Sequence, residues 1–418
     1  MAELTECDAA LLLRLIDLPT AGPLEARGAP LLLWEAQDEY ATAAKRIGFE
    51  VVHHAPTALS DLDLPGVPAA VRAVAVEPGF LDSQPNLVLR IGPADAPTVM
   101  FNVHLDTVAG YEPGSFDGHV FRGRGAVDAK GPAVALLAGI RDAIAQDPRV
   151  GTEITVLVQA VSGEEGGAMG TFGTRPLVNK GFTGALNVFC EPTGLRYLTR
   201  ATASATARVR VSGTGSIDDR PADGHNATVL LGFLAQHLAR ELAGKRACIA
   251  GLHTGEAHNR VYGRGSLLVN LAYTDDGDTL TAAFDEAVHT GLARFTETFA
   301  AGPELARTAA DADRITTVDW LKRGLPALTG GGPWLDGLMT AAGVPAWPPE
   351  APAFTCDAIW LAGVPGRAAA VLGPGDLAAN NAHADGEFVA AAELAAFADQ
   401  VSRLLRAFTA TPTRTAPE

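Results

Sequence analysis

The sequence predicts an α/β fold, in which a mixed, mostly parallel sheet has helices on both faces and carries an inserted, smaller α+β domain. Strand-like and helix-like segments alternate over the first 200 residues, which is typical of parallel sheets. The pattern changes near residue 203 and resumes near residue 314. At 418 residues the chain is also too long for one ordinary core. We therefore expect a main domain over residues 1–202 and 313–418, and an inserted domain over residues 203–312.

The main domain is expected to begin with helices and to continue with buried strands. Apolar residues at helical spacing indicate the helices, one of which ends at Gly48, while Pro132 suits the first turn of another. Short apolar runs rich in β-branched residues indicate the strands. In chain order we expect helices over 8–17 and 33–47, strands over 49–52 and 98–104, a helix over 132–146, strands over 153–161 and 186–190, and a last helix over 388–408.

The inserted domain is predicted from a different order of the same signals. Strand-like and helix-like segments alternate there, which indicates a small α+β insertion. The expected elements are a strand over 206–212, a helix over 227–242, a strand over 266–274 and a helix over 280–299.

Composition and charge limit the classes of partner. The formal net charge of −16 repels phosphate groups, so nucleic acids and anionic membranes are unfavourable partners and a small-molecule substrate is favoured. No apolar stretch approaches the roughly 20 residues that a spanning helix needs. The acidic N-terminus does not resemble an export signal, and the four cysteines lack the spacing of a zinc finger or disulfide scaffold. We expect a cytoplasmic protein.

The first candidate site is His104-Leu-Asp106, at the end of a predicted buried strand. Residues two apart lie on the same side of a strand, so Asp106 could hold one ring nitrogen of His104 while the other binds a metal ion. A pair of this kind on its own is more commonly structural.

The second candidate is Asp128, which follows a glycine-rich turn and precedes a predicted helix. A metal ligand, a helix N-cap and part of a phosphate cradle are all consistent with that position. The spacing of the turn does not match a Walker motif.

Further carboxylates follow two more apolar strands. Glu164 and Glu165 are adjacent, and such a pair is unfavourable unless a cation neutralises it, although a solvated acidic turn is the alternative. Glu191 follows the next strand, and His383 lies near the C-terminus. Because open α/β sheets bind ligands at the carboxyl ends of their strands, these positions together predict one site.

The order and the residues of these motifs resemble those of the acetylornithine deacetylase and succinyl-diaminopimelate desuccinylase family, which includes aminoacylases and glutamate carboxypeptidases. The resemblance covers nearly the whole chain and rests on His104-Leu-Asp106, Gly123–Gly131, Glu164-Glu165-Gly166, Glu191-Pro-Thr193 and His383. It implies a dizinc aminopeptidase-like catalytic domain and an inserted lid and dimerisation domain, through which a homodimer would form.

The resemblance also implies a role for each of these residues. Asp128 would bridge two Zn²⁺ ions, with His104 and Glu191 on one ion and Glu165 and His383 on the other. Glu164 would be the general base that later protonates the leaving amine, and Asp106 would fix the tautomer of His104. In the family the peptide bond after the bridging aspartate is cis. The donor set of two histidines and three carboxylates suits zinc, and equally allows Co²⁺ or Mn²⁺.

The inserted domain departs from the family's biosynthetic deacylases. Ile217 stands where they carry a histidine that stabilises the oxyanion, and Thr202 and Ala272 stand where the desuccinylases carry arginines that hold carboxylates. His258 and, second to it, His225 are candidate substitutes for the histidine. His258, Asn259, Arg260 and Thr355 are the candidate substrate-binding residues.

The predicted function is therefore broader than either biosynthetic activity. We expect a metal-dependent deacylase that cleaves an amide bond of a small N-acyl amino acid or N-acyl amine by activated water. A carboxypeptidase or dipeptidase on the same scaffold is the alternative, and an inactive binding protein is a remote one. The sequence does not identify the substrate.

Overall fold

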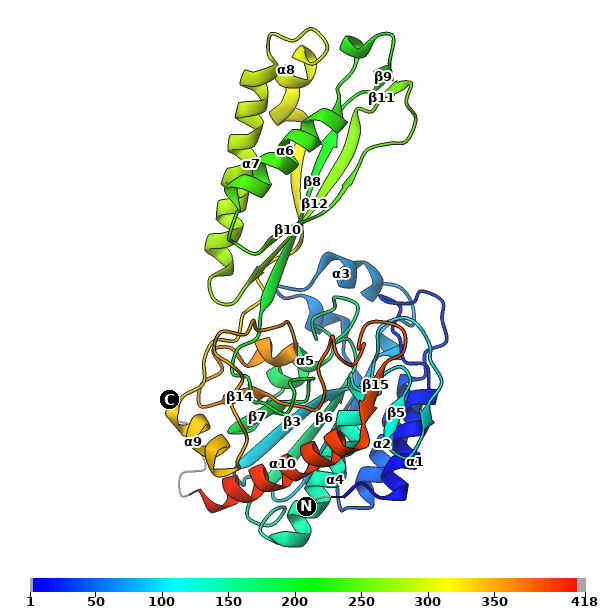
Figure 1. Ribbon diagram of the computed structural model, residues 1–418, viewed down its shortest axis with the longest axis vertical. Helices are drawn as coiled ribbons and strands as arrows, with labels where there is room; N and C mark the ends of the chain where they lie inside the picture. The colour runs from blue at the N-terminus through cyan, green and yellow to red at the C-terminus, as the bar shows by residue number, and fades with distance from the viewer. Residues whose placement is uncertain (1–2, 412–418) are drawn as a thin grey trace. The chain divides into compact units, whose positions relative to one another are not determined.

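The computed structural model describes residues 3–411 of the chain and divides it into two compact units. The main unit comprises the residues up to Leu64, Ala70–Ala201 and the residues from Leu328 onward. The inserted unit comprises Pro65–Ala69 and Thr202–Ala327. Each unit has its own sheet and helices (Figure 1).

A six-stranded mixed sheet forms the centre of the main unit. Its strands, in spatial order, are β1 (Glu50–Pro56), β2 (Pro85–Ile91), β6 (Thr155–Val161), β3 (Thr98–His104), β7 (Leu186–Phe189) and β14 (Ala368–Val371). The pairs β6 with β3, β3 with β7 and β7 with β14 are parallel, whereas β1 and β2 join antiparallel at one edge. Strands β3 and β6 are almost entirely buried, as their continuous apolar runs predicted. The mixed, mostly parallel sheet is confirmed.

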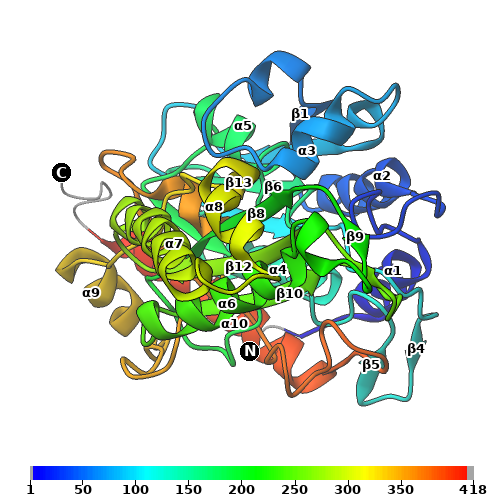
Figure 2. The same cartoon turned by 90° about the horizontal axis from the view of Figure 1, so that it is seen from above.

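Helices cover both faces of this sheet (Figures 1 and 2). On one face α4 packs against β3 and against α1 and α10, and α2 packs against β2, while on the other α5 packs against a 3-10 turn, η4. Gly139 of α4 allows the close approach of α10, because an added Cβ would lie 2.4 Å from the carbonyl oxygen of Ala398. The helical elements are α1 (Glu6–Asp17), α2 (Leu33–Lys45), α3 (Ala69–Ala75), α4 (Lys130–Gln146), α5 (Thr174–Asn179), α9 (Pro333–Ala341), η4 (Asp357–Leu361) and α10 (Ala391–Ala410).

The last helix starts later than the sequence suggests. Phe388–Ala390, expected to be helical, forms strand β15, which pairs with β5 (Val120–Arg122). Together with β4 (Ser115–Phe116) these strands make a small sheet in the order β15-β5-β4. The partner strand lies more than 260 residues away in sequence, so no local signal marks the pairing. The helical pattern of the residues that follow therefore led to the prediction of a longer helix.

The inserted unit is a four-stranded antiparallel sheet with helices packed on it. The order is β10 (Ala247–His253), β12 (Arg264–Tyr273), β8 (Ala203–Ser212) and β13 (Thr316–Lys322). Helices α6 (Ala227–Glu241) and α7 (Gly277–Phe299) pack on the sheet, α8 (Ala306–Ile315) packs on β13, and β9 (Ser216–Ile217) pairs with β11 (Arg260–Val261).

Strand β13 belongs to the inserted unit, although the sequence analysis assigned residues 313–327 to the main domain. It pairs along its length with β8, from Thr316 opposite Val211 to Lys322 opposite Thr206. This pairing joins segments more than 100 residues apart, which local patterns do not reveal. In the described part of the chain no helix is long and apolar enough to cross a membrane.

Candidate metal centre

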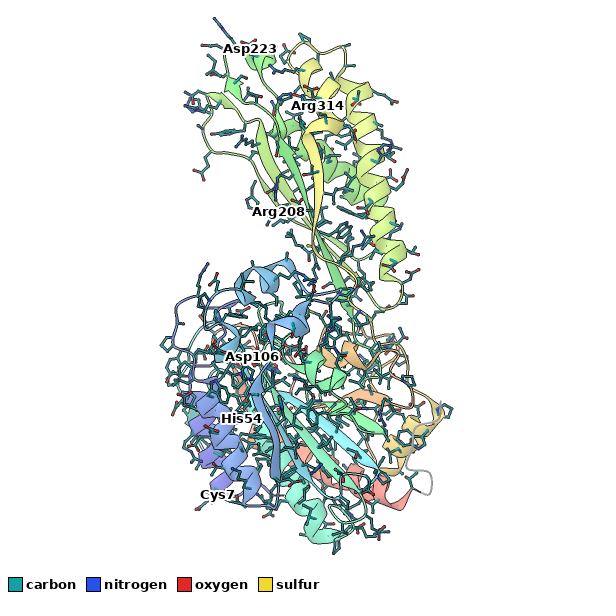
Figure 3. The ribbon with its side chains drawn as sticks, turned by 180° about the vertical axis from the view of Figure 1, so that it is seen from behind. Cys7, His54, Asp106, Arg208, Asp223 and Arg314 are labelled. Atoms are coloured by element: carbon teal, nitrogen blue, oxygen red, sulfur yellow. The ribbon has the colours of Figure 1, made fainter. Side chains whose placement is uncertain are left out.

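The candidate residues converge at one edge of the six-stranded sheet. Strands β3, β6 and β7 run parallel, so their carboxyl ends meet there, with His104 directly opposite Val161 in register. His104 ends β3, Glu165 follows β6, and Glu191 follows β7. Asp106, labelled in Figure 3, marks this edge. Regular backbone pairing therefore brings together side chains that are up to 87 positions apart in the sequence.

Asp128 stands at the centre of this cluster. Its Oδ1 lies 3.0 Å from Nε2 of His104, and its Oδ2 lies 3.1 Å from Nε2 of His383. Helix α4 begins two residues later with Ala129 as its N-cap, and no side chain caps it. The helix-cap alternative for Asp128 is therefore wrong. The peptide bond between Asp128 and Ala129 is cis, as the resemblance implied.

Side chains approach the Asp128 carboxylate from two sides. On one side Oε1 of Glu191 lies 3.9 Å from Nε2 of His104, and on the other Oε1 of Glu165 lies 3.2 Å from Nε2 of His383. His104, Asp128 and Glu165 also offer ligand atoms that all lie within 4.8 Å of one another. Two imidazoles and three carboxylates in this arrangement are a suitable donor set for two divalent cations.

The backbone oxygen of Asp106, and not its carboxylate as the sequence suggested, contacts the ring of His104. Nδ1 of His104 lies 2.9 Å from the backbone oxygen of Asp106 and 3.8 Å from its carboxylate. A carbonyl oxygen only accepts hydrogen bonds, so Nδ1 carries the proton and Nε2 remains available as a ligand. The carboxylate of Asp106 instead accepts the backbone N–H of Glu165 at 3.0 Å, and so positions the turn after β6.

Burial makes this cluster costly without a cation. His104 is 1% exposed and Glu191 is 6% exposed. Burial, followed by the neighbouring carboxylates, raises the pKa of Glu164 well above its ordinary value, and burial also raises the pKa of Glu165 and of Glu191. Burial acts the same way on Asp128, but hydrogen bonds from His104 and His383 outweigh it and lower the pKa of that carboxyl. Bound divalent cations would offset the cost of gathering these charges.

Because bound cations would offset the cost of burying these carboxylates, we predict that metal removal destabilises the protein. Zinc at 100 times its dissociation constant should contribute about 2.7 kcal/mol per site to the free energy of unfolding. We expect calorimetry of chelator-treated protein to show a thermal midpoint that rises by several degrees on adding zinc. The Asp128→Ala variant is the control and should show little change. An equal midpoint with and without zinc in the parent protein would contradict the prediction.

The structure adds buried residues that the sequence analysis did not assign. Asp357 is buried and accepts a hydrogen bond from the Thr174 hydroxyl at 2.5 Å, while neighbouring Thr355, a predicted substrate residue, is exposed. Lys130 is buried and donates to the backbone oxygen of Leu18 at 2.9 Å. Burial lowers the pKa of Lys130 to about 7. Lys130 lies within the Gly123–Gly131 motif and Asp357 lies two residues after Thr355, but short motifs do not show which side chains turn inward.

In the inserted unit the candidate substrate residues are exposed. His258 and Asn259 precede β11, and Arg260 stands opposite Ile217 in the pairing of β11 with β9. Ile217 is 51% exposed, whereas Thr202 is buried and Ala272 is partly buried. Participation of His258, Asn259 and Arg260 in substrate binding stays a prediction.

His225 is not a substitute for the missing histidine. Its ring is 3% exposed, Nδ1 accepts the N–H of Thr214 at 2.9 Å, and Nε2 lies 3.0 Å from Oδ2 of Asp311. Both ring nitrogens are therefore engaged within the inserted unit, and neither remains for a substrate oxygen. The sequence showed a histidine near the right position but could not show that its ring turns inward.

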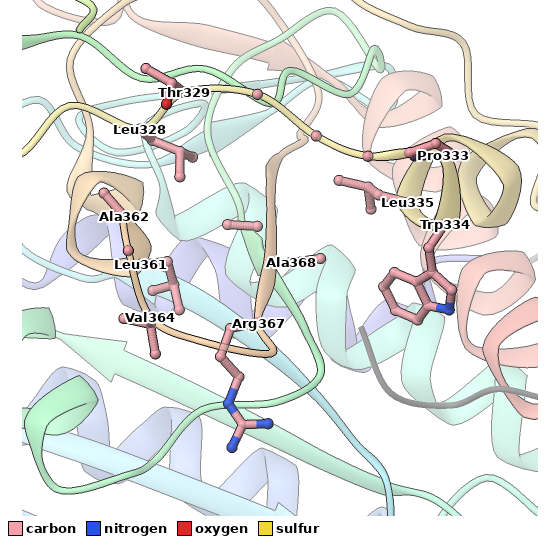
Figure 4. Close-up of a pocket in the computed structure, with 15 residues that line it drawn as sticks. Leu328, Thr329, Pro333, Trp334, Leu335, Leu361, Ala362, Val364, Arg367 and Ala368 are labelled. Carbon is pink, nitrogen blue, oxygen red and sulfur yellow. The ribbon is translucent and has the colours of Figure 1, made fainter. Parts of the chain in front are cut away.

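One cavity of the main unit is lined by residues other than those of the carboxylate cluster. It has a volume of about 460 Å³, and Leu328, Trp334, Leu361, Val364 and Arg367 are among its lining residues (Figure 4). Arg367 is its one charged lining residue, and no candidate metal ligand lines it.

A cluster of two histidines and three carboxylates offers the kinds of ligand that the metal ions of hydrolases use. The chain belongs to peptidase family M20/M25/M40, whose model matches residues 100–407. The family resemblance inferred from the motifs is thereby confirmed.

The chain is similar by sequence or by fold to the following three proteins. A protein of Aeropyrum pernix, named as a LysW-lysine/LysW-ornithine hydrolase, is 34% identical over 205 residues, which are 48% of this chain and 54% of that protein. The chain thus spans about half the length of that relative. The fold is shared with the aminopeptidase PepT from Bacillus cereus, at a TM-score of 0.69 and 16% identity, with 98% of this chain and 100% of that one covered. It is also shared with the M20 metallo-carboxypeptidase Sso-CP2 from Sulfolobus solfataricus, at a TM-score of 0.67 and 12% identity, with the same coverage.

Proposed function

We propose that this protein is a dizinc deacylase that hydrolyses an amide bond of a small N-acyl amino acid or N-acyl amine. The observation that carries the proposal is the position of Asp128, whose two carboxylate oxygens each face a different histidine. His104 and Glu191 would hold one ion, and Glu165 and His383 the other. Co²⁺ or Mn²⁺ would satisfy the same donors.

The bound ions would supply Lewis acidity to a water molecule and to the amide carbonyl. Glu164 is the chain's own contribution to the proton transfers: its carboxylate accepts the proton of the attacking water and then delivers it to the leaving nitrogen. Asp106 contributes by orientation, because its backbone oxygen fixes the ring of His104 and its carboxylate holds the N–H of Glu165. His104, Asp106 and Glu165 are buried, whereas Glu164 is partly buried and His383 is exposed, so the cluster is open to solvent on the side of His383.

The deacylase proposal competes with a peptidase activity. The relative from Aeropyrum pernix is named as a LysW-lysine/LysW-ornithine hydrolase, and two proteins of the same fold are named as peptidases. A screen of the zinc-loaded protein with N-acetyl, N-succinyl and N-formyl amino acids against dipeptides separates the two. Faster turnover of the N-acyl compounds supports a deacylase, faster turnover of dipeptides supports a peptidase, and no amide cleavage overturns both.

Location and assembly are further parts of the proposal. A homodimer through the inserted unit agrees with the family resemblance. A cytoplasmic location agrees with the scattered cysteines, which are free thiols in the structure. Size-exclusion chromatography with light scattering tests the dimer.

We predict that acetylornithine and succinyl-diaminopimelate are poorer substrates than a less anionic N-acyl amine. The reason is the side chains at Ile217, Thr202 and Ala272, which cannot make the contacts of a histidine and two arginines. Each missing charge-assisted hydrogen bond is worth about 1.5 to 3 kcal/mol. Measured kcat/KM values test this order. A higher kcat/KM for succinyl-diaminopimelate than for every neutral compound would contradict it.

A further inference from the structure

Arg124 and Glu387 form a buried ion pair beside the candidate metal centre. Arg124 precedes Asp128 by four residues and Glu387 follows His383 by four residues. Nη1 of Arg124 lies 2.9 Å from Oε2 of Glu387, and the two residues are 4% and 0% exposed. A pair so fully removed from water is costly unless its remaining polar atoms are also bonded.

The carboxylate of Glu387 holds the backbone that carries Asp128. Oε1 accepts the N–H of Val127 at 2.8 Å and the N–H of Asp128 itself at 3.1 Å. Oε2 accepts the N–H of Gly125 at 2.8 Å in addition to the guanidinium. These three N–H groups belong to the glycine-rich turn, so one side chain from the C-terminal part of the chain fixes the orientation of the turn.

The guanidinium of Arg124 holds the backbone that carries His383. Nη1 donates to the oxygen of Ala382 at 2.8 Å, and Nη2 donates to the oxygen of Ala384 at 3.1 Å. These are the residues immediately before and after His383. Nε donates to the oxygen of Gly110 at 3.0 Å, which fixes the plane of the group itself. The five N–H donors of an arginine fit this set of acceptors, whereas the single ammonium of a lysine does not.

We propose that Arg124 and Glu387 are positioning residues that set the distance and orientation between Asp128 and His383, and hence the affinity of the metal site that these two ligands share. Each member of the pair holds the segment on which the other member lies: Glu387 binds the turn that carries Arg124 and Asp128, and Arg124 binds the segment that carries His383 and Glu387. The inference rests on the proposed function, because it assumes that Asp128 and His383 bind metal.

The test is metal affinity rather than activity alone. Glu387→Gln keeps the size of the side chain, but its NH₂ group cannot accept the N–H groups that one carboxylate oxygen now accepts. Loss of such a partner behind a metal ligand typically weakens metal binding roughly 10- to 100-fold. We expect zinc titration of the metal-free protein to show this loss for one of two ions, and the cobalt-loaded variant to have an altered visible absorption spectrum.

A matched control is available in the same unit. Arg141 and Asp8 form a two-point ion pair at 2.9 and 2.7 Å between α4 and α1, and no candidate ligand takes part in it. Asp8→Asn should lower the thermal midpoint and leave both zinc affinities unchanged. Arg124→Lys keeps the charge and should weaken zinc binding at the same site as Glu387→Gln. If the Glu387→Gln variant is not soluble, the Arg124→Lys variant provides the test.

Three outcomes are decisive. Weaker binding of one ion and a changed cobalt spectrum in the Arg124 or Glu387 variants, but not in Asp8→Asn, support the proposal. The proposal is overturned if the parent binds two ions and those variants keep its zinc affinity and cobalt spectrum. It is also overturned if Asp8→Asn loses as much zinc affinity as they do. A parent protein that binds no zinc instead overturns the proposed function.

Discussion

Glu164→Gln is expected to lower kcat on the order of 10² to 10⁴-fold while the metal content stays close to that of the parent. The amide keeps the shape of the side chain but does not accept a proton at neutral pH. Glu164 also lies in the turn held by Asp106, so its replacement by an isosteric residue should leave the fold intact. Steady-state kinetics on the best substrate of the screen, together with elemental analysis of the same sample, measures both quantities.

Glu165→Gln is the matched control for that experiment because it changes the adjacent residue in the same way. Glu165 lies 3.2 Å from His383 and belongs to the carboxylate cluster. Its variant should lose metal, and excess zinc should restore part of its activity. A Glu164 variant that loses metal beside a Glu165 variant that keeps it would reverse the two assignments.

Asp128→Ala is expected to remove both metal ions and to abolish turnover. The side chain faces His104 through one oxygen and His383 through the other, so no replacement without a carboxylate can serve both sets. His383→Ala removes a ligand of one set only and should retain about one ion per chain. Metal content measured after gel filtration distinguishes these variants. Full metal loading of Asp128→Ala would show that the carboxylate does not bridge the sites.

Much of the main unit and the candidate centre could be predicted from the sequence because their signals are local. The strand Thr98–His104 has the predicted bounds, since its continuous apolar run reflects burial on both faces. Polar residues that directly follow such strands must lie at the sheet edge, and parallel pairing then brings His104, Glu165 and Glu191 together. Asp128 and His383 were candidates from their motifs, and the family resemblance added their roles as metal ligands, which no strand pattern indicates.

What could not be predicted depends on contacts between distant segments. Strand β13 pairs with β8, and β15 pairs with β5, across separations that hydropathy patterns do not encode. The same limit applies to single side chains. His225 turns inward to Asp311, and the carboxylate of Asp106 holds Glu165 rather than the ring of His104. Glu387 lies four residues after His383, but only the fold shows that it reaches the turn of Asp128.

Anomalous diffraction from a crystal of the zinc-loaded protein, recorded at the zinc absorption edge, tests the shared carboxylate most directly. The account predicts two zinc peaks, one on each side of Asp128, with His104 and Glu191 beside the first and Glu165 and His383 beside the second. A single peak, or peaks that do not contact Asp128, would contradict it.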